Sequence, residues 1–208
     1  MIIVVGGHSR NIGKTAVMCG IVEGLRGYDW TALKITQYGH GRCSKDGKPC
    51  TCADPRRPVC IDEQTQPDPA NDTGRYLVAG AAKSYWVRTP RGRLAEAMPE
   101  IRRILAAAPY AIVESNSVLG FLRPDLTVMV LDGGIPDFRP STKLFLDRAD
   151  LLVQTSEAPL QWPGISAHLL AGKPIHKALA PRYRSELLIS AISSVLVPPP
   201  TPAPQVQY

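Results

Sequence analysis

The chain has 208 residues, 44% of them hydrophobic and 20% charged, which suits one α/β domain and leaves no room for a second full domain. The net charge is +6, but the basic residues form no long run. Anionic small ligands therefore explain the excess of positive charge as well as nucleic acid does, and no nucleic acid partner is expected. The apolar run at 2–5 is too short for a signal peptide or a membrane span, so we expect a cytoplasmic protein with no membrane partner.

Strand-like and helix-like segments alternate along the chain. The β-branched run at 2–5 is typical of a parallel strand buried on both faces, and the periodicity of 15–25 predicts a helix after a glycine-rich loop. Further apolar runs predict strands at 30–35, 110–113, 126–131 and 151–154. Helices are expected around 74–82, 93–107, 141–148 and 182–197. The alternation predicts a three-layer α/β fold with a mostly parallel sheet.

Two segments depart from this alternation. Residues of about 38–70 are rich in Gly, Pro, Cys and charge, and we interpret them as a Cys-rich insertion after the second strand. The proline-rich end, 198–208, is expected to be a disordered tail. The remaining 1–197 would then form one domain.

The loop between the first strand and the first helix has the composition of a phosphate-binding loop. It reads Gly-His-Ser-Arg-Asn-Ile-Gly-Lys-Thr over 7–15, and its backbone N–H groups would surround phosphates. Lys14 would contact the outer phosphates, and the Thr15 hydroxyl would bind magnesium. The alternative is an ordinary turn in which Gly-Lys-Thr occurs by chance. The predicted nucleotide-binding residues are Gly7, Asn11, Gly13, Lys14, Thr15, Ala16 and, at the end of a later strand, Gln154.

Five residues separate Gly7 from Gly13, where the common motif has four, and this spacing resembles that of dethiobiotin synthetase and the cobyrinic acid amide synthases. Lys34-Ile35-Thr36 is similar to the Lys-Pro-Val of the synthetases, without the proline. The stretch 71–81 (NDTGRYLVAGA) is similar to the molybdopterin-guanine dinucleotide biosynthesis protein B family, and 113–117 (VESNS) to the Val-Glu-Gly of both groups, with serine for glycine. The resemblance implies a three-layer P-loop NTPase fold, and the synthetases add the expectation of a homodimer.

Two carboxylates are candidates for magnesium binding. Glu114 ends a predicted strand, where ligands bind in open α/β sheets, and Asp72 belongs to the Asn-Asp-Thr stretch that carries the resemblance. With the Thr15 hydroxyl they would complete part of an octahedral oxygen shell. Asn-Asp-Thr also suits a helix start, so the alternative for Asp72 is an ordinary helix cap or a solvated acid.

The catalytic residues predicted from these motifs are Lys14, Lys34 and Glu114. Lys14 and magnesium would stabilise charge that develops on the transferred phosphoryl group, while Lys34 and Glu114 would face an acceptor. Arg139 and Lys143 are further candidates for a phosphate contact, against the alternative of a solvated helix start. No Asn-Lys-x-Asp guanine-reading motif is present, so ATP is favoured and GTP stays open.

Four of the five cysteines lie within 43–60, which makes a metal site plausible. Thiolates suit either zinc or an iron–sulfur cluster, and binding energy would hold together a segment that lacks an apolar core. The spacing matches no familiar zinc or ferredoxin motif, and redox-active thiols or a disulfide formed on oxidation are the alternatives. The expected ligands are Cys43, Cys50, Cys52 and Cys60, with His40 as a further one. Cys19 is expected in the core.

Three functions fit these features. The first is an ATP-dependent enzyme of cofactor or small-molecule metabolism that activates an acceptor by phosphoryl transfer. The second is a nucleotide-hydrolysing accessory protein for assembly of a molybdopterin cofactor or a metal centre, acting on a partner protein. The third is a regulatory or nucleic-acid module that senses nucleotide, which only the pI of about 9.2 supports.

Overall fold

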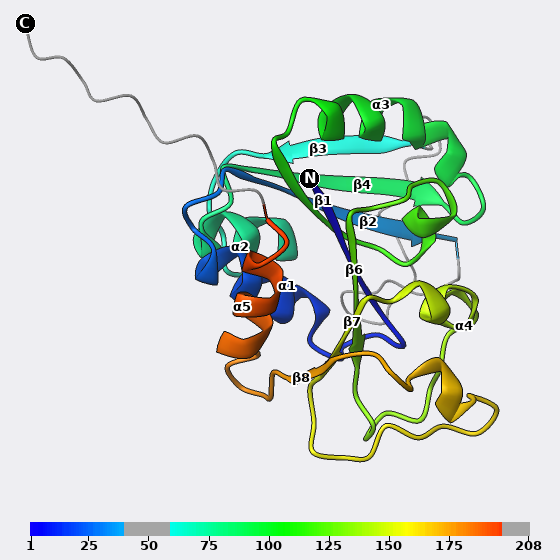
Figure 1. Cartoon of the computed structure of the whole chain (residues 1–208). Helices are drawn as coiled ribbons and strands as arrows, with labels where there is room; N and C mark the ends of the chain where they lie inside the picture. Colours follow the sequence, from blue (N-terminus) through cyan, green and yellow to red (C-terminus); the bar gives the residue numbers. More distant parts are fainter. Residues whose placement is uncertain (40–58, 197–208) are drawn as a thin grey trace, which may run out of the picture.

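The computed structural model describes residues 1–39 and 59–196, and Figure 1 shows helices on both faces of a central sheet. The strands are β1 Ile2–Gly7, β2 Trp30–Tyr38, β3 Cys60–Gln64, β4 Lys83–Pro90, β5 Tyr110–Glu114, β6 Leu126–Leu131, β7 Leu151–Gln154 and β8 Ile175–Lys177. The helices are α1 Lys14–Gly24, α2 Asp72–Ala79, α3 Leu94–Ala106, α4 Pro140–Phe145 and α5 Glu186–Ser193, and short 3₁₀ helices lie at Ser117–Gly120, Leu146–Arg148 and Ala167–Leu169.

Within the described residues the strands form one sheet in the order β3-β4-β2-β5-β1-β6-β7-β8. Each neighbouring pair is parallel except β3 with β4. The carboxyl ends of β1, β2, β4, β5 and β6 therefore meet at the same edge. Because ligands of open α/β sheets bind outside these ends, the topology places the loops after β1, β2 and β5 together.

Alternate residues of each strand face different helices. Val5 and Trp30 belong to a core shared with α1, α2 and α5, whereas Val4, Leu33 and Val113 pack on the other face with α3. These strand residues are almost completely inaccessible to solvent, as the unbroken apolar runs predict for strands covered on both sides. The three-layer α/β architecture with a mostly parallel sheet, headed by a strand, a glycine-rich loop and a helix, is confirmed.

Three strands were not predicted. β4 lies between β2 and β3, β8 adds a short parallel strand at the other edge, and β3 is the antiparallel strand. The interpretation of 38–70 as a wholly irregular insertion is wrong at both ends, because Tyr38 still belongs to β2 and 60–64 form β3. Pairing with β4 stabilises β3 although its own sequence, CIDEQ, is largely polar.

Some predictions fall outside the described part of the chain. These are the proposed ligands His40, Cys43, Cys50 and Cys52, and the tail at 198–208. Among the described helices, none has both the length and the apolar character needed to cross a membrane.

Candidate functional site

The loop from Gly7 to Gly13 wraps around the start of α1. Gly13 adopts a left-handed conformation with φ of 88°, and Asn11, a residue type that tolerates this region, has φ of 56°. A Cβ atom at Gly13 would lie 2.4 Å from Cε1 of Tyr183, so the ring of Tyr183 closes against the loop. Glycine is therefore required here by both backbone conformation and space.

Asn116, just after β5, holds the beginning of the loop. Its Oδ1 accepts a hydrogen bond from the Gly7 N–H at 2.8 Å, and its Nδ2 donates to the Gly7 carbonyl at 2.9 Å. The Thr142 hydroxyl also donates to that carbonyl, at 2.8 Å. The backbone N–H and carbonyl of Gly7 are thereby hydrogen-bonded by side chains that follow β5 and lie in α4.

His8 is buried and fixes the loop to the segment after β6. Its Nδ1 lies 3.0 Å from the Asp137 carbonyl, and its Nε2 lies 3.0 Å from the Asp132 N–H, which donates to it. Phe138 stacks on the ring and Trp162 packs against it. Burial, together with the nearby charge of Lys14, lowers the pKa of His8 to about 4, so the imidazole is neutral at pH 7.

Lys14, the first residue of α1, folds back over the loop. Its Nζ donates to the Ser9 carbonyl at 2.5 Å, and among the described residues it has no ion-pair partner within 4 Å. Burial is the main reason that its pKa falls to about 8, and the positive charge of Lys34 lowers it further. An ammonium group held in this state has strong affinity for an added anion.

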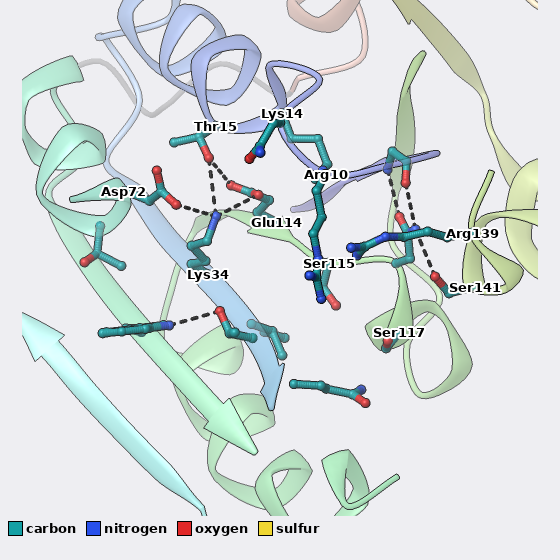
Figure 2. Close-up of a pocket in the computed structure, with 18 of the residues that line it drawn as sticks. Arg10, Lys14, Thr15, Lys34, Asp72, Glu114, Ser115, Ser117, Arg139 and Ser141 are labelled. Carbon is teal, nitrogen blue, oxygen red and sulfur yellow. Dashed lines mark hydrogen bonds and ion pairs between the residues drawn. The ribbon is translucent and has the colours of Figure 1, made fainter. Parts of the chain in front are cut away.

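A cluster of charged groups lies beside Lys14, where the middle of β2 and the carboxyl end of β5 meet the start of α2 (Figure 2). The Lys34 ammonium lies 2.6 Å from an Asp72 oxygen, 2.8 Å from a Glu114 oxygen and 3.3 Å from the Thr15 hydroxyl. The Thr15 hydroxyl in turn donates to Glu114 at 2.8 Å. The three oxygen-bearing side chains predicted to bind magnesium thus converge on one point, and a cationic group of the protein lies there.

Glu114 is almost completely buried and is charged nonetheless. Burial alone raises its pKa, but the Lys34 and Lys14 ammonium groups outweigh this and hold the pKa below its usual value. The hydroxyl of Tyr76, itself fully buried, also donates to Glu114. Burial by itself would lower the pKa of Lys34, but Glu114 and Asp72 raise it by more, so this pKa lies above its usual value.

Asp72 is not the cap of α2. The capping residue is Asn71, whose side chain accepts a hydrogen bond from the Gly74 N–H at 2.7 Å. The Asp72 carboxylate is instead directed at Lys34, which leaves its oxygens beside those of Glu114. The alternative interpretation of Asp72 as a cap is therefore wrong.

These groups line one cavity of about 760 Å³, a size within the usual range for small-molecule sites. Among the described residues, basic side chains outnumber acidic ones in its wall. The basic ones are Arg10, Lys14, Lys34, Arg75, Arg88, Arg91 and Arg139, and the acidic ones are Asp72 and Glu114. The cavity is thus built for a ligand with several negative charges.

Most of the predicted site residues line this cavity. They are Gly7, Asn11, Gly13, Lys14, Thr15, Ala16, Lys34, Asp72, Glu114 and Arg139. Two others do not: the Gln154 amide donates to the Ala158 carbonyl at 2.9 Å, and Lys143 is exposed on α4. Gln154 lies apart from the cavity because β6 separates its strand, β7, from β1 and the phosphate-loop region. Lys143 lies apart because its side chain is exposed to solvent on α4.

Several lining residues were missed by the sequence reasoning, notably Arg10, Asn116, Tyr183 and the pair Trp86 and Arg88. Arg10 lies within the loop motif, and its charge was the available signal. Asn116 lies in the 113–117 motif two residues after Glu114, which was the signal for it. Tyr183, Trp86 and Arg88 had none, because Tyr183 lies far along the chain and the other two belong to the unpredicted strand β4.

The cysteines give a different result. Cys60 lies in β3 opposite Arg88 of β4, and the described part of the chain contains no group of three or more His, Cys, Asp or Glu side chains placed to hold a metal ion. Of the ligands proposed for the cysteine site, only Cys60 lies in the described part of the chain. Cys19 packs against the core as expected, and burial raises the pKa of its thiol to about 11.

The chain was compared with known proteins. No protein-family model matches it, and no curated protein matches it in sequence. Among solved structures it is similar to LpxK from Aquifex aeolicus, in a crystal structure described as the "apo" form in complex with ATP, with 19% sequence identity and a TM-score of 0.46. The match covers 85% of this chain and 53% of LpxK, so the chain spans about half the length of that protein.

Proposed function

We propose that this protein is a magnesium-dependent enzyme that binds a nucleoside triphosphate, with ATP favoured, and transfers a phosphoryl group to a small-molecule acceptor in cofactor or small-molecule metabolism. The observation that supports this most directly is the convergence of Lys14, Thr15 and Glu114 on one basic cavity at the carboxyl ends of parallel strands. A lysine, a hydroxyl and a buried carboxylate are groups that P-loop enzymes use for phosphoryl transfer.

The phosphates would lie over the loop between β1 and α1. Backbone N–H groups at the start of α1 point toward such an anion, and the left-handed Gly13 leaves no side chain in the way. Lys14 would exchange its hydrogen bond to the Ser9 carbonyl for one to a phosphate oxygen. Arg10 and Arg139, which Figure 2 shows beside the loop, would add positive charge on the outer side.

Thr15, Asp72 and Glu114 fit a magnesium site in their chemistry, because a hydroxyl and two carboxylates are oxygen donors of the kind that Mg²⁺ takes together with water. Their convergence on the Lys34 ammonium supports this assignment, because the same oxygens already surround a cationic group of the protein. A bound Mg²⁺ would neutralise charge on the phosphates. Lys34, at the border between the loop and the rest of the cavity, would then face the acceptor.

In the proposed reaction an acceptor oxygen forms a bond to the γ-phosphorus, and the bond from that phosphorus to the β–γ bridging oxygen breaks. The electron pair leaves with the nucleoside diphosphate. Lys14 would stabilise the charge that develops on the transferred group, and its effect is large because the site is partly buried.

Isothermal titration calorimetry with ATP and GTP, each with and without Mg²⁺, tests the proposal. We expect binding that Lys14→Ala weakens at least about a hundredfold, since a charge-assisted phosphate contact contributes roughly 3 kcal/mol. Lys143→Ala is the matched control, because this lysine is exposed and lies outside the cavity, and it should bind as the wild type does. Equal affinity of the Lys14→Ala variant and the wild type would refute the assignment of the loop.

A nucleotide-hydrolysing accessory protein is the second candidate. It is favoured by the two described residues that flank the Cys-rich segment, because Tyr38 at the end of β2 lines the cavity and Cys60 in β3 pairs with the cavity residue Arg88. A metal or cofactor carried there would be coupled to the nucleotide site. Turnover that a partner protein accelerates, and that no small acceptor changes, would favour this candidate over the first.

A further inference from the structure

The cavity continues beyond the phosphate loop along one face of β2 and β4. The register of these strands pairs Lys34 with Trp86 and Thr36 with Arg88, and all four line the cavity. Earlier on the same face, Trp30 and Ala32 are fully buried in the core under α1 and α2. Thr36, Trp86 and Arg88 are instead only partly buried, so past Lys34 the sheet face borders a cavity rather than a helix.

The side chains of this region hold each other in place. The Trp86 indole N–H donates to the Thr36 hydroxyl at 3.1 Å, and the Arg88 guanidinium lies 4.5 Å from the centre of the Trp86 ring. Arg88 also forms an ion pair with Asp62, whose side chain is 58% exposed. The Nε–H of Arg88 is buried and has no hydrogen-bond partner among residues 1–39 and 59–196, so within this part of the chain the guanidinium keeps unused donor capacity.

The charges divide between the two ends of the cavity. At the loop end, Lys14, Arg10 and Arg139 are available for the phosphates of a nucleotide. Lys34 is neutralised by Asp72 and Glu114.

At the other end, Arg91 forms no ion pair or side-chain hydrogen bond among the described residues, and Arg88 is balanced only by a solvated carboxylate. A solvated carboxylate neutralises a guanidinium only partly, because water competes with the guanidinium for the carboxylate oxygens. The β2/β4 end therefore carries its own excess of positive charge.

We propose that the β2/β4 end of the cavity is the acceptor subsite, and that the acceptor is a small molecule carrying an oxyanion, a carboxylate or a phosphate, which Arg88 and Arg91 bind beside Trp86. That the bound molecule is the acceptor rests on the proposed function. The anion-binding subsite itself is inferred from the contacts of Trp86 and Arg88 and from the charge of Arg91. Planar guanidinium groups bind both oxyanions through paired N–H donors.

The fluorescence of Trp86 provides a direct test. Of the three tryptophans, Trp30 is fully buried and Trp162 is 4% exposed, so Trp86 dominates the fluorescence that a dissolved quencher can reach. Iodide should quench this fraction several-fold more strongly than caesium does, because the subsite attracts anions. Trp86→Phe should abolish the iodide-sensitive fraction.

The arginines are tested by Arg91→Gln and by Arg88→Lys, which keeps the charge and the fold. Arg91→Gln should lower the iodide quenching constant without changing quenching by neutral acrylamide, because it removes one positive charge from the cavity wall. Arg88→Lys should keep iodide quenching and weaken oxyanion binding. The control is Arg123→Gln, an exposed position outside the cavity, which should change neither.

The source of the oxyanion is then determined with the nucleotide site filled by magnesium and a non-hydrolysable ATP analogue. Malonate and inorganic phosphate are titrated separately, and the one that protects Trp86 from iodide identifies the class. Equal quenching by iodide and caesium, or no effect of Arg91→Gln, would overturn the proposal. Calorimetry of the analogue in the same samples separates the two hypotheses, because absent nucleotide binding with intact anion selectivity would refute the proposed function and leave the subsite in place.

Discussion

Replacing Lys14 with methionine should make the ligand-free protein more stable while removing its function. The pKa of Lys14 falls from 10.5 to about 8, so keeping the ammonium charged in the folded protein at pH 7 costs about 3 kcal/mol. Methionine has similar length and no charge. It leaves the Ser9 carbonyl without its donor, which costs about 1 kcal/mol, so the net gain in unfolding free energy is about 2 kcal/mol.

The sign of the pH dependence follows from the same pKa. Below about pH 8 both the folded and the unfolded wild type carry the Lys14 charge, and the full penalty applies. Between about 8 and 10.5 the folded protein loses this proton first, so the wild type gains stability relative to the variant as pH rises. The advantage of Lys14→Met should therefore be largest at pH 7 and nearly absent by about pH 10.

Urea unfolding of the two proteins at pH 7, 8.5 and 10 measures this difference, with Lys143→Met as the control for an exposed lysine. Adding Mg²⁺ and ATP at pH 7 should reverse the order, because the ligand stabilises only a protein that binds it. A Lys14→Met variant that is less stable than the wild type at pH 7, or whose advantage does not change with pH, would refute the argument that this lysine is held at an energetic cost for ligand binding.

Three further predictions concern the loop. His8 has a pKa lowered from 6.5 to about 4, so the wild type should lose up to about 3 kcal/mol of stability as pH falls from 6.5 to 4, and His8→Gln should lose less over the same range in urea unfolding. Gly13→Ala should prevent nucleotide binding in calorimetry through clash and backbone strain. Adding Tyr183→Ala should recover stability only in part, since φ stays at 88°, and full recovery would show that strain is unimportant. Asn116→Ala removes two hydrogen bonds to Gly7 and should lower the unfolding free energy by about 2 kcal/mol and weaken ATP binding about tenfold, whereas Asn116→Asp should keep the bond from the Gly7 N–H and retain part of both.

The sequence by itself determined the local parts of this site. The apolar run of β1 and the periodicity of α1 are short-range patterns, and a glycine before Lys14 fits the left-handed turn that the structure shows at Gly13. Glu114 was predictable for the same reason, because an acidic residue directly after a fully apolar strand marks the edge of a parallel sheet where ligands bind. Asp72 depended on the resemblance, since its own surroundings fitted a helix cap equally well.

Only the tertiary structure decided what these parts face. β4 has an alternating and partly charged sequence, and its place between β2 and β3 comes from pairing with strands far away in the chain. That pairing sets Trp86 beside Lys34 and Arg88 beside Thr36, and it thereby creates the second end of the cavity. Likewise, the Lys34 ammonium meets Asp72 and Glu114 only because β2 lies next to β5 and α2 begins above them. Periodicity and turn chemistry act over a few residues, whereas strand order and register are set by burial of the whole core. Strand order and register in turn decide which charged side chains line the cavity.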